Sequence, residues 1–191
     1  MKKLFAIILC ALLLLPTLAS CSNPPAVEDV RDEIAALIEA SHEINDIFYG
    51  EGLPVDTTLS SGYEKFNCVS ASSPYGSLAE IKEAAEKVYS AEYMAAIYDM
   101  MFSGHYDSVS GSVQQALYWE TNGKLLKYKE ATVYLTGDHR TYDYSTMKIV
   151  KPSSADYIKF EIMSEKNGEQ MLVRLSAVLT ENGWRLDSPT Y

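Results

Sequence analysis

The segment Asp138-His139-Arg140 has the residue types that acid–base chemistry or anion binding would use. His139 could act as a base oriented by Asp138, and Arg140 could hold a carboxylate. Gly137 comes directly before the segment, which indicates a turn. Neighbouring side chains on an extended chain point to opposite faces, so Asp138 and His139 do not easily bond to each other. The sequence therefore favours a solvated turn here over a catalytic pair.

The remaining histidines and Cys68 form no recognisable reactive pattern. His105 and Asp107 lie two residues apart in a stretch rich in Ser and Gly, whereas zinc takes three or four ligands. His42 lies on the acidic face of a predicted helix, without a partner nearby in sequence. Cys68 precedes a valine and is typical of a small buried hydrophobe rather than of a nucleophile. We predict no catalytic residue, cofactor or metal ion.

Tyrosine is abundant, with 14 residues. Six of them fall in the half of the chain that we predict to form sheet, where their hydroxyls could line a cavity and donate to a small ligand. Half-buried strand positions also suit tyrosine, and strand packing is the favoured interpretation. An isomerase-like pocket would need Tyr144 or Tyr157 beside Asp143 or Glu161. The six tyrosines are Tyr118, Tyr128, Tyr134, Tyr142, Tyr144 and Tyr157.

Acidic residues gather in the first predicted helix. Between Ala26 and Glu51 there are eight acids and one base, in a chain whose formal charge is −10. Nucleic acid is not expected as a partner, because phosphates are bound by clustered Lys and Arg. Glu39 and Glu43 lie four residues apart and repel each other, so they gain nothing within the helix. Two interpretations stay open: a solvated face, and a patch that attracts a basic partner through Glu39, Glu43 and Asp46.

The N-terminus has the pattern of a secretory signal. Lys2 and Lys3 precede an apolar stretch, residues 4–18, that is too short to cross a hydrocarbon core of ~30 Å as a helix. The stretch ends in Leu18-Ala19-Ser20-Cys21, which resembles the lipobox of bacterial lipoproteins. That resemblance implies removal of residues 1–20 and acylation of Cys21. The alternative is an ordinary secretory signal that is cut near Ser20.

An acylated Cys21 would anchor the protein to the outer face of the cell membrane, because two acyl chains hold stably in a bilayer. Residues 21–25 would then be a short tether for a single domain over residues 26–191. The mature chain would carry 14 bases against 26 acids, since Lys2 and Lys3 leave with the signal. Cys68 would have no free partner for a disulfide.

Three helices are predicted in the first half of the domain. Apolar residues over 26–49 recur at alternating steps of three and four, interrupted by one serine, which predicts an amphipathic helix that ends at Gly50. The sequence Ser77-Leu78-Ala79-Glu80 is a capping-box pattern that begins a second helix. Ser90 can begin a third helix, which stops at Gly104.

The rest of the chain is predicted to form strands. Asn-Gly dipeptides at 122–123, 167–168 and 182–183 are typical of tight hairpins between apolar runs. Residues 50–62 and 105–115 are expected to be loops, with a short extended stretch over 63–69. The sequence therefore predicts an α+β fold, in which N-terminal helices pack on one bent antiparallel sheet of five to six strands.

This order of elements resembles the cystatin-like, nuclear-transport-factor-two-like superfamily, in which a bent sheet wraps a long helix. More narrowly, the chain resembles the IseA-type inhibitors of peptidoglycan DL-endopeptidases. The residues that carry this likeness are Ile47-Phe48-Tyr49-Gly50, the helix pair from Ser77 to Met101, Asn122-Gly123-Lys124-Leu125 and the ending Gly183-Trp184-Arg185. The resemblance implies a secreted protein that blocks the cleft of a cell-wall hydrolase, without chemistry of its own.

We therefore expect a membrane-anchored, non-catalytic binding module that regulates a peptidoglycan endopeptidase. Two alternatives stay open. One is a small-ligand binder with a tyrosine-lined cavity, and the other is an isomerase-like enzyme on the same pocket.

Overall fold

The computed structural model describes residues 23–107 and 112–191. Cys21 and the predicted signal, residues 1–20, lie outside the described residues. Within the described ranges no helix has the length and apolarity needed to cross a membrane. The elements are α2 (Val27–Tyr49), β1 (Val55–Asp56), β2 (Phe66–Val69), α3 (Leu78–Glu86), α4 (Ala91–Tyr98), the π-helical turn η1 (Asp99–Ser103), β3 (His105–Asp107), β4 (Ser112–Gln114), β5 (Tyr118–Thr121), β6 (Lys124–Tyr128), β7 (Thr141–Val150), β8 (Tyr157–Lys166), β9 (Glu169–Thr180) and β10 (Gly183–Leu186).

The α+β class is confirmed, but the described strands are divided differently from the prediction. Instead of one sheet of five to six strands there are two antiparallel sheets of four, ordered β1-β2-β6-β5 and β10-β9-β8-β7. The first sheet recruits β1 and β2 from the segment between α2 and α3. There β2 pairs with β6 in the register Phe66 to Tyr128 and Cys68 to Leu126. Strand β2 lies within the extended stretch predicted over 63–69, whereas β1 was not predicted. A strand as short as β1 depends on a distant partner for its backbone hydrogen bonds, so local patterns do not reveal it.

The predicted loop over 105–115 is wrong in part. The backbone of β3 pairs with that of β4, in the register His105 to Gln114 and Asp107 to Ser112. The predicted loop over 50–62 likewise contains the two residues of β1, which pair with β2. In both places the Ser and Gly content favours a loop, whereas the pairing comes from the strand opposite.

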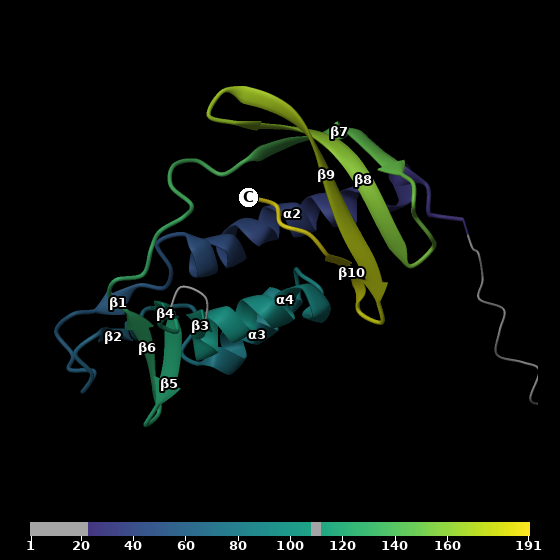
Figure 1. Ribbon diagram of the computed structural model, residues 1–191. Helices are drawn as coiled ribbons and strands as arrows, with labels where there is room; N and C mark the ends of the chain where they lie inside the picture. The colour runs from purple at the N-terminus through teal and green to yellow at the C-terminus, as the bar shows by residue number, and fades with distance from the viewer. Residues whose placement is uncertain (1–22, 108–111) are drawn as a thin grey trace, which may run out of the picture.

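Helix α2 lies between the two sheets. The sheet β10-β9-β8-β7 curves over its length, and the other sheet lies beyond its C-terminal end (Figure 1). Ile34 and Ile38 of α2 are fully buried in one cluster with Phe160 and its neighbours on β8. The alternation predicted for β8 is confirmed, since Ile158, Phe160 and Ile162 are all buried. The helix therefore supplies the cover that the inner face of this sheet requires.

The serine caps and two of the three Asn-Gly turns are confirmed, whereas the third hairpin turns at Glu181 and Asn182, and Gly183 already pairs with Thr180. Asn122 and Asn167 have φ of 51° and 55°, and each is followed by a glycine that also has positive φ, as a tight hairpin turn requires. The side chains of Ser77 and Ser90 accept from the backbone N–H groups of Glu80 and Tyr93, at 3.2 and 3.0 Å. These capping bonds satisfy donors that the first helical turns leave free.

A buried polar network explains the serine that interrupts the apolar stripe of α2. Ser41 shares a hydrogen bond of 2.6 Å with the hydroxyl of Thr190. The Asn45 amide donates to the same Thr190 oxygen at 2.9 Å. The Tyr89 hydroxyl donates to Asn45 Oδ1 and also bonds to Thr190, both at 2.9 Å. The network joins α2, the junction of α3 and α4, and the C-terminal segment.

The junction of α3 and α4 also covers the edge of β10. Ser90 N donates to Leu186 O at 2.8 Å, and Leu186 N donates to Val88 O at 2.9 Å. On the N-terminal half of α2, Glu33 accepts from Trp184 N at 2.8 Å. An uncovered strand edge invites pairing with another chain, so these bonds both attach the C-terminal strand and protect it.

We predict that Thr190→Val lowers the free energy of unfolding by about 1–3 kcal/mol. The substitution keeps the shape of the side chain but leaves the buried Asn45 amide without this acceptor. Urea unfolding followed by circular dichroism measures the change. Thr57→Val, at an exposed turn position, is the matched control and should change stability by less than about 0.5 kcal/mol. Equal effects of the two substitutions would contradict the role of the network.

Candidate functional site

Residues 131–140, the strap, connect β6 to β7 across the C-terminal end of α2. The backbone N–H groups of Tyr134 and Leu135 both donate to Tyr49 O, at 2.7 and 2.9 Å. The Arg140 guanidinium donates to Ser164 Oγ on β8 at 3.0 Å. The strap is thus attached at its middle to the last turn of α2 and at its end to the second sheet. A separate hollow lies on each side of it.

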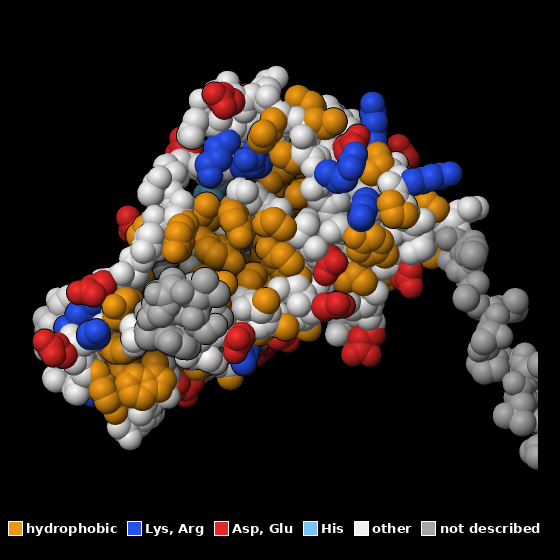
Figure 2. Space-filling model, viewed as in Figure 1, with side chains coloured by type: hydrophobic (Ala, Val, Ile, Leu, Met, Phe, Trp, Pro, Cys, Tyr) orange, Lys and Arg blue, Asp and Glu red, His pale blue; other side chains and the backbone are white. Residues whose placement is uncertain are grey.

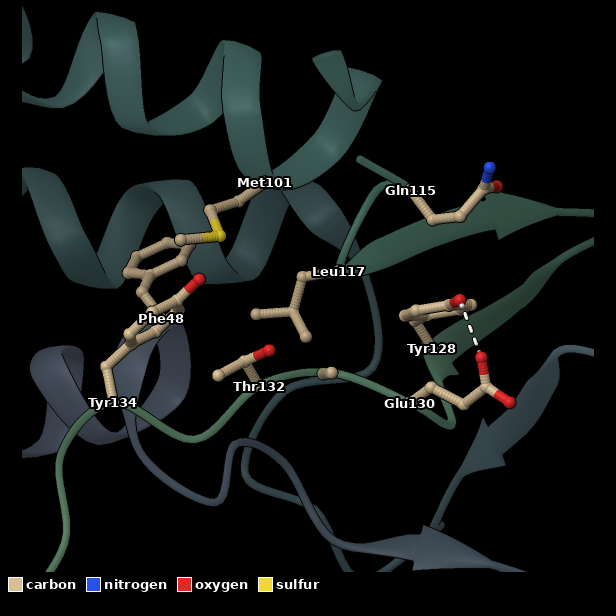
Figure 3. Close-up of a pocket in the computed structure, with 9 residues that line it drawn as sticks. Phe48, Met101, Gln115, Leu117, Tyr128, Glu130, Thr132 and Tyr134 are labelled. Carbon is tan, nitrogen blue, oxygen red and sulfur yellow. Dashed lines mark hydrogen bonds between the residues drawn. The ribbon is translucent and has the colours of Figure 1, made fainter. Parts of the chain in front are cut away.

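The first hollow, the trough, has a volume of about 270 Å³. Aromatic and apolar side chains stand at one end and the Tyr128–Glu130 pair at the other, with Leu117 and Thr132 between them (Figure 3). The Tyr128 hydroxyl donates to Glu130 Oε2 at 3.1 Å. Among the described residues that line the trough, Glu130 alone carries a formal charge. The lining residues are Phe48, Met101, Gln115, Leu117, Tyr128, Glu130, Ala131, Thr132 and Tyr134.

The second hollow contains a stacked pair of histidines. The rings of His42 on α2 and His139 on the strap are parallel within 4°, and their centroids lie 4.3 Å apart. His139 Nε2 lies 3.1 Å from Asp46 Oδ2, and His42 Nδ1 lies 3.8 Å from Glu39 Oε2. The His42 side chain is only 21% exposed. Sequence reasoning missed this pair because its members come from different elements.

The pKa of His42 lies below its ordinary value. Burial is the main cause, because it penalises the charged ring, and the neighbouring His139 adds to the effect. Glu39, the backbone of Arg140 and Asp46 act in the opposite direction, but they do not outweigh it. A neutral His42 is therefore the form that the folded protein favours.

The three acids predicted to bind a partner lie along α2, and each has a partner within the chain. Glu39 accepts from the Tyr144 hydroxyl at 2.6 Å, and Glu43 accepts from the Tyr75 hydroxyl at 2.9 Å. Burial, followed by the bond to Glu43, raises the pKa of Tyr75 to about 12. Asp46 faces His139. Half or more of the Glu39 and Asp46 side chains remains exposed, so their role toward a partner stays a prediction.

The residues considered for an isomerase-like pair have other partners. Asp143 accepts from the Ser145 hydroxyl at 2.6 Å, and Glu161 pairs with Arg174. Cys68 is buried in β2, as predicted for a small hydrophobe. The side chains of His105 and Asp107 lie outside the described part of the structure. Within that part, no three His, Cys, Asp or Glu side chains form a cluster that could hold a metal ion.

The abundant tyrosines do not share one cavity. Tyr118 is buried, donates to Ile47 O and accepts from Leu53 N. Tyr142 donates to the carbonyl of Thr190 at 2.7 Å. Of the six tyrosines in the predicted sheet half, Tyr128 and Tyr134 line the trough. The interpretation of tyrosine as a packing residue thus fits some positions, and its interpretation as a lining residue fits others.

Hydrophobic side chains also gather across the middle of one face, over α2 and the C-terminal segment (Figure 2). The rings of Tyr49 and Tyr191 lie 4.7 Å apart, and Tyr191 is 40% exposed. Tyr134 of the strap is 65% exposed. Exposed aromatic side chains of this kind are typical of surfaces that contact other proteins.

A scan against models of known protein families found no match, and a search of curated proteins found none either.

We predict that His42 makes the stability of the protein depend on pH. An unfolded His42 titrates near pH 6.5, whereas the folded protein holds its pKa lower, so the unfolded chain binds the proton more readily. The free energy of unfolding should therefore fall as the pH drops below about 6.5. Urea titrations between pH 7.5 and 5 should show a steeper fall for the wild type than for His42→Phe.

His105→Gln, which removes the remaining histidine outside the pair, is the control and should follow the wild-type curve. Parallel curves for His42→Phe and the wild type would contradict the prediction.

Proposed function

We propose that the protein is a lipid-anchored, extracytoplasmic binding module without chemistry of its own, and that its partner is a peptidoglycan endopeptidase. The trough is the observation that carries the proposal. Among the residues that the structure describes, its walls combine aromatic and apolar side chains with one carboxylate at one end. Pockets of this composition anchor a few side chains of a protein partner and supply most of the binding energy.

The charges of the trough indicate what kind of segment it would accept. Phe48, Met101 and Tyr134 offer contacts to an apolar side chain, and Glu130 offers an ion pair to a basic one (Figure 3). The chain as a whole carries a formal charge of −10, which attracts a basic surface over longer distances. A partner segment with an apolar residue close to a lysine or arginine fits both features.

The exposed rim and modest volume of the trough favour a side chain of a protein partner over a free small ligand. Ligand sites commonly have ~300–1,000 Å³ and bury most of the ligand. At about 270 Å³, and with exposed Glu130, Thr132 and Tyr134 on its rim, the trough lies just below that range. It suits one or two side chains of a larger partner, whose surface would extend over the rim.

The proposal includes the finer fold assignment. Helix α2 under the curved sheet β10-β9-β8-β7 supports a cystatin-like arrangement for that half of the protein (Figure 1). For the likeness to the IseA-type inhibitors, support comes from the positions of its motifs. Residues 47–50 end α2 beside the trough, the hairpin at Asn122-Gly123 joins β5 to β6, and Gly183-Trp184-Arg185 lies in β10.

The binding test uses purified peptidoglycan DL-endopeptidase, with affinity measured by calorimetry and inhibition by muropeptide release. We expect micromolar or tighter binding at low salt. Glu130→Lys and Tyr134→Ala should each weaken it by about tenfold or more, as loss of an anchor does. Glu181→Lys makes the same charge change in the exposed turn between β9 and β10, and it should keep the affinity nearly unchanged. No binding at tens of micromolar by the wild type would refute the proposed partner.

The anchor has a separate test. We predict that Cys21→Ser moves the protein from the membrane fraction to the soluble fraction of a bacterial host, because no acyl chain can then be attached. Partitioning into a detergent phase measures the change. Cys68→Ala is the control, since it removes the other mature cysteine and should leave the protein in the detergent phase. Membrane retention of Cys21→Ser would contradict lipid anchoring.

A further inference from the structure

We infer that the stacked His42–His139 pair is an acid-sensitive latch, which holds the strap in place at neutral pH and loosens it when the pH falls. The inference rests on the proposed function in one respect, namely that the trough beside the strap is the binding surface. The latch would then regulate that surface. The opening of the strap can be measured without any partner.

The strap forms part of the wall of both hollows, so a movement at one hollow can reach the other. Ala131, Thr132 and Tyr134 form one side of the trough, and residues 135–140 line the hollow with the histidines. Between these parts, the strap is attached to α2 by the two N–H bonds to Tyr49 O. Displacement of His139 from α2 would therefore strain those two bonds first and then move Tyr134, an exposed wall of the trough.

The arrangement of the pair disfavours the state in which both histidine rings carry a proton. From α2 the pair faces Glu39 and Asp46, and from the strap it faces Asp138 and Arg140. Lys166 of β8 and Tyr191 at the C-terminus line the same hollow. His139 Nε2 lies 3.1 Å from the Asp46 carboxylate. Protons on both histidines would place like charges on parallel rings whose centroids are 4.3 Å apart.

The least costly way to relieve this repulsion is to separate the rings. His42 belongs to α2, whose buried face is fixed by the core, whereas His139 belongs to a strap without regular secondary structure. Exposure to water would also remove the burial that disfavours a charged His42. Protonation of the pair therefore favours the state in which the strap has left α2. A reversible local opening of this kind is a common form of conformational switch.

Hydrogen exchange of the full chain in detergent micelles tests the latch directly. The backbone amides of Tyr134 and Leu135 are the reporters, because both donate to Tyr49 O. Protection factors correct for the pH dependence of intrinsic exchange. Between pH 7.5 and 5.5 we expect those of the wild type to fall severalfold, because the open state binds the proton more readily. The amides of the β8–β9 ladder should stay more strongly protected than the two reporters at both pH values, which separates local opening from global unfolding.

Two variants identify the histidines as the cause. His42→Phe keeps an aromatic ring in the stack but cannot take up a proton, and His139→Phe removes the opposing charge from the other side. His42→Phe should abolish most of the pH effect, and His139→Phe should reduce it while the burial of His42 remains, whereas His105→Gln should retain it in full. Constant wild-type protection, or an equal fall in all three variants, overturns the latch.

The latch and the proposed function can fail separately. A pH-dependent loss of protection in a protein that does not bind the endopeptidase upholds the latch and overturns the proposed function. Binding of the endopeptidase without any such loss of protection overturns the latch alone.

Discussion

The hydroxyl of Thr190 connects the parts of this protein that lie far apart in the chain. Its oxygen bonds to Ser41 and Asn45 of α2 and to Tyr89 at the junction of α3 and α4, all of them buried. Buried polar groups are costly when unpaired, so each requires the others to be in place. The Thr190 carbonyl accepts in addition from Tyr142 of β7. The C-terminal segment is thus bonded to α2, to the junction of α3 and α4, and to β7.

The position of the C-terminal segment in turn supports the candidate site. Tyr191 packs on Tyr49, and the carbonyl of Tyr49 accepts the two N–H bonds that attach the strap. The strap then separates the trough from the histidine pair. Because both hollows adjoin the C-terminal half of α2, a rigid element sets the geometry of each, as a precise binding surface requires.

The acidic face of α2 has a structural role as well as an electrostatic one. Glu39 and Glu43 accept hydrogen bonds from tyrosine hydroxyls of distant segments. Asp46 faces His139, and Glu33 accepts a hydrogen bond from the backbone N–H of Trp184. The repulsion between neighbouring acids within the helix is therefore offset by donors from outside it. Their remaining exposed oxygens still contribute to the negative field of a chain with a formal charge of −10.

The sequence alone determined those features that depend on neighbouring residues. The span of α2, the caps at Ser77 and Ser90, the Asn-Gly hairpins and the alternation in β8 follow from helical periodicity, orphaned N–H groups, positive φ and strand pleating. Tyr128 and Tyr134 were identifiable as possible lining residues, but Phe48 and Met101 carried no signal beyond a place in the core. Only the tertiary structure decided that eight of the described strands form two four-stranded sheets, that Thr190 bonds to Ser41, and that His42 stacks on His139. Each of these contacts joins residues from separate elements, and short-range sequence patterns contain no information about which distant side chain will complete a buried bond.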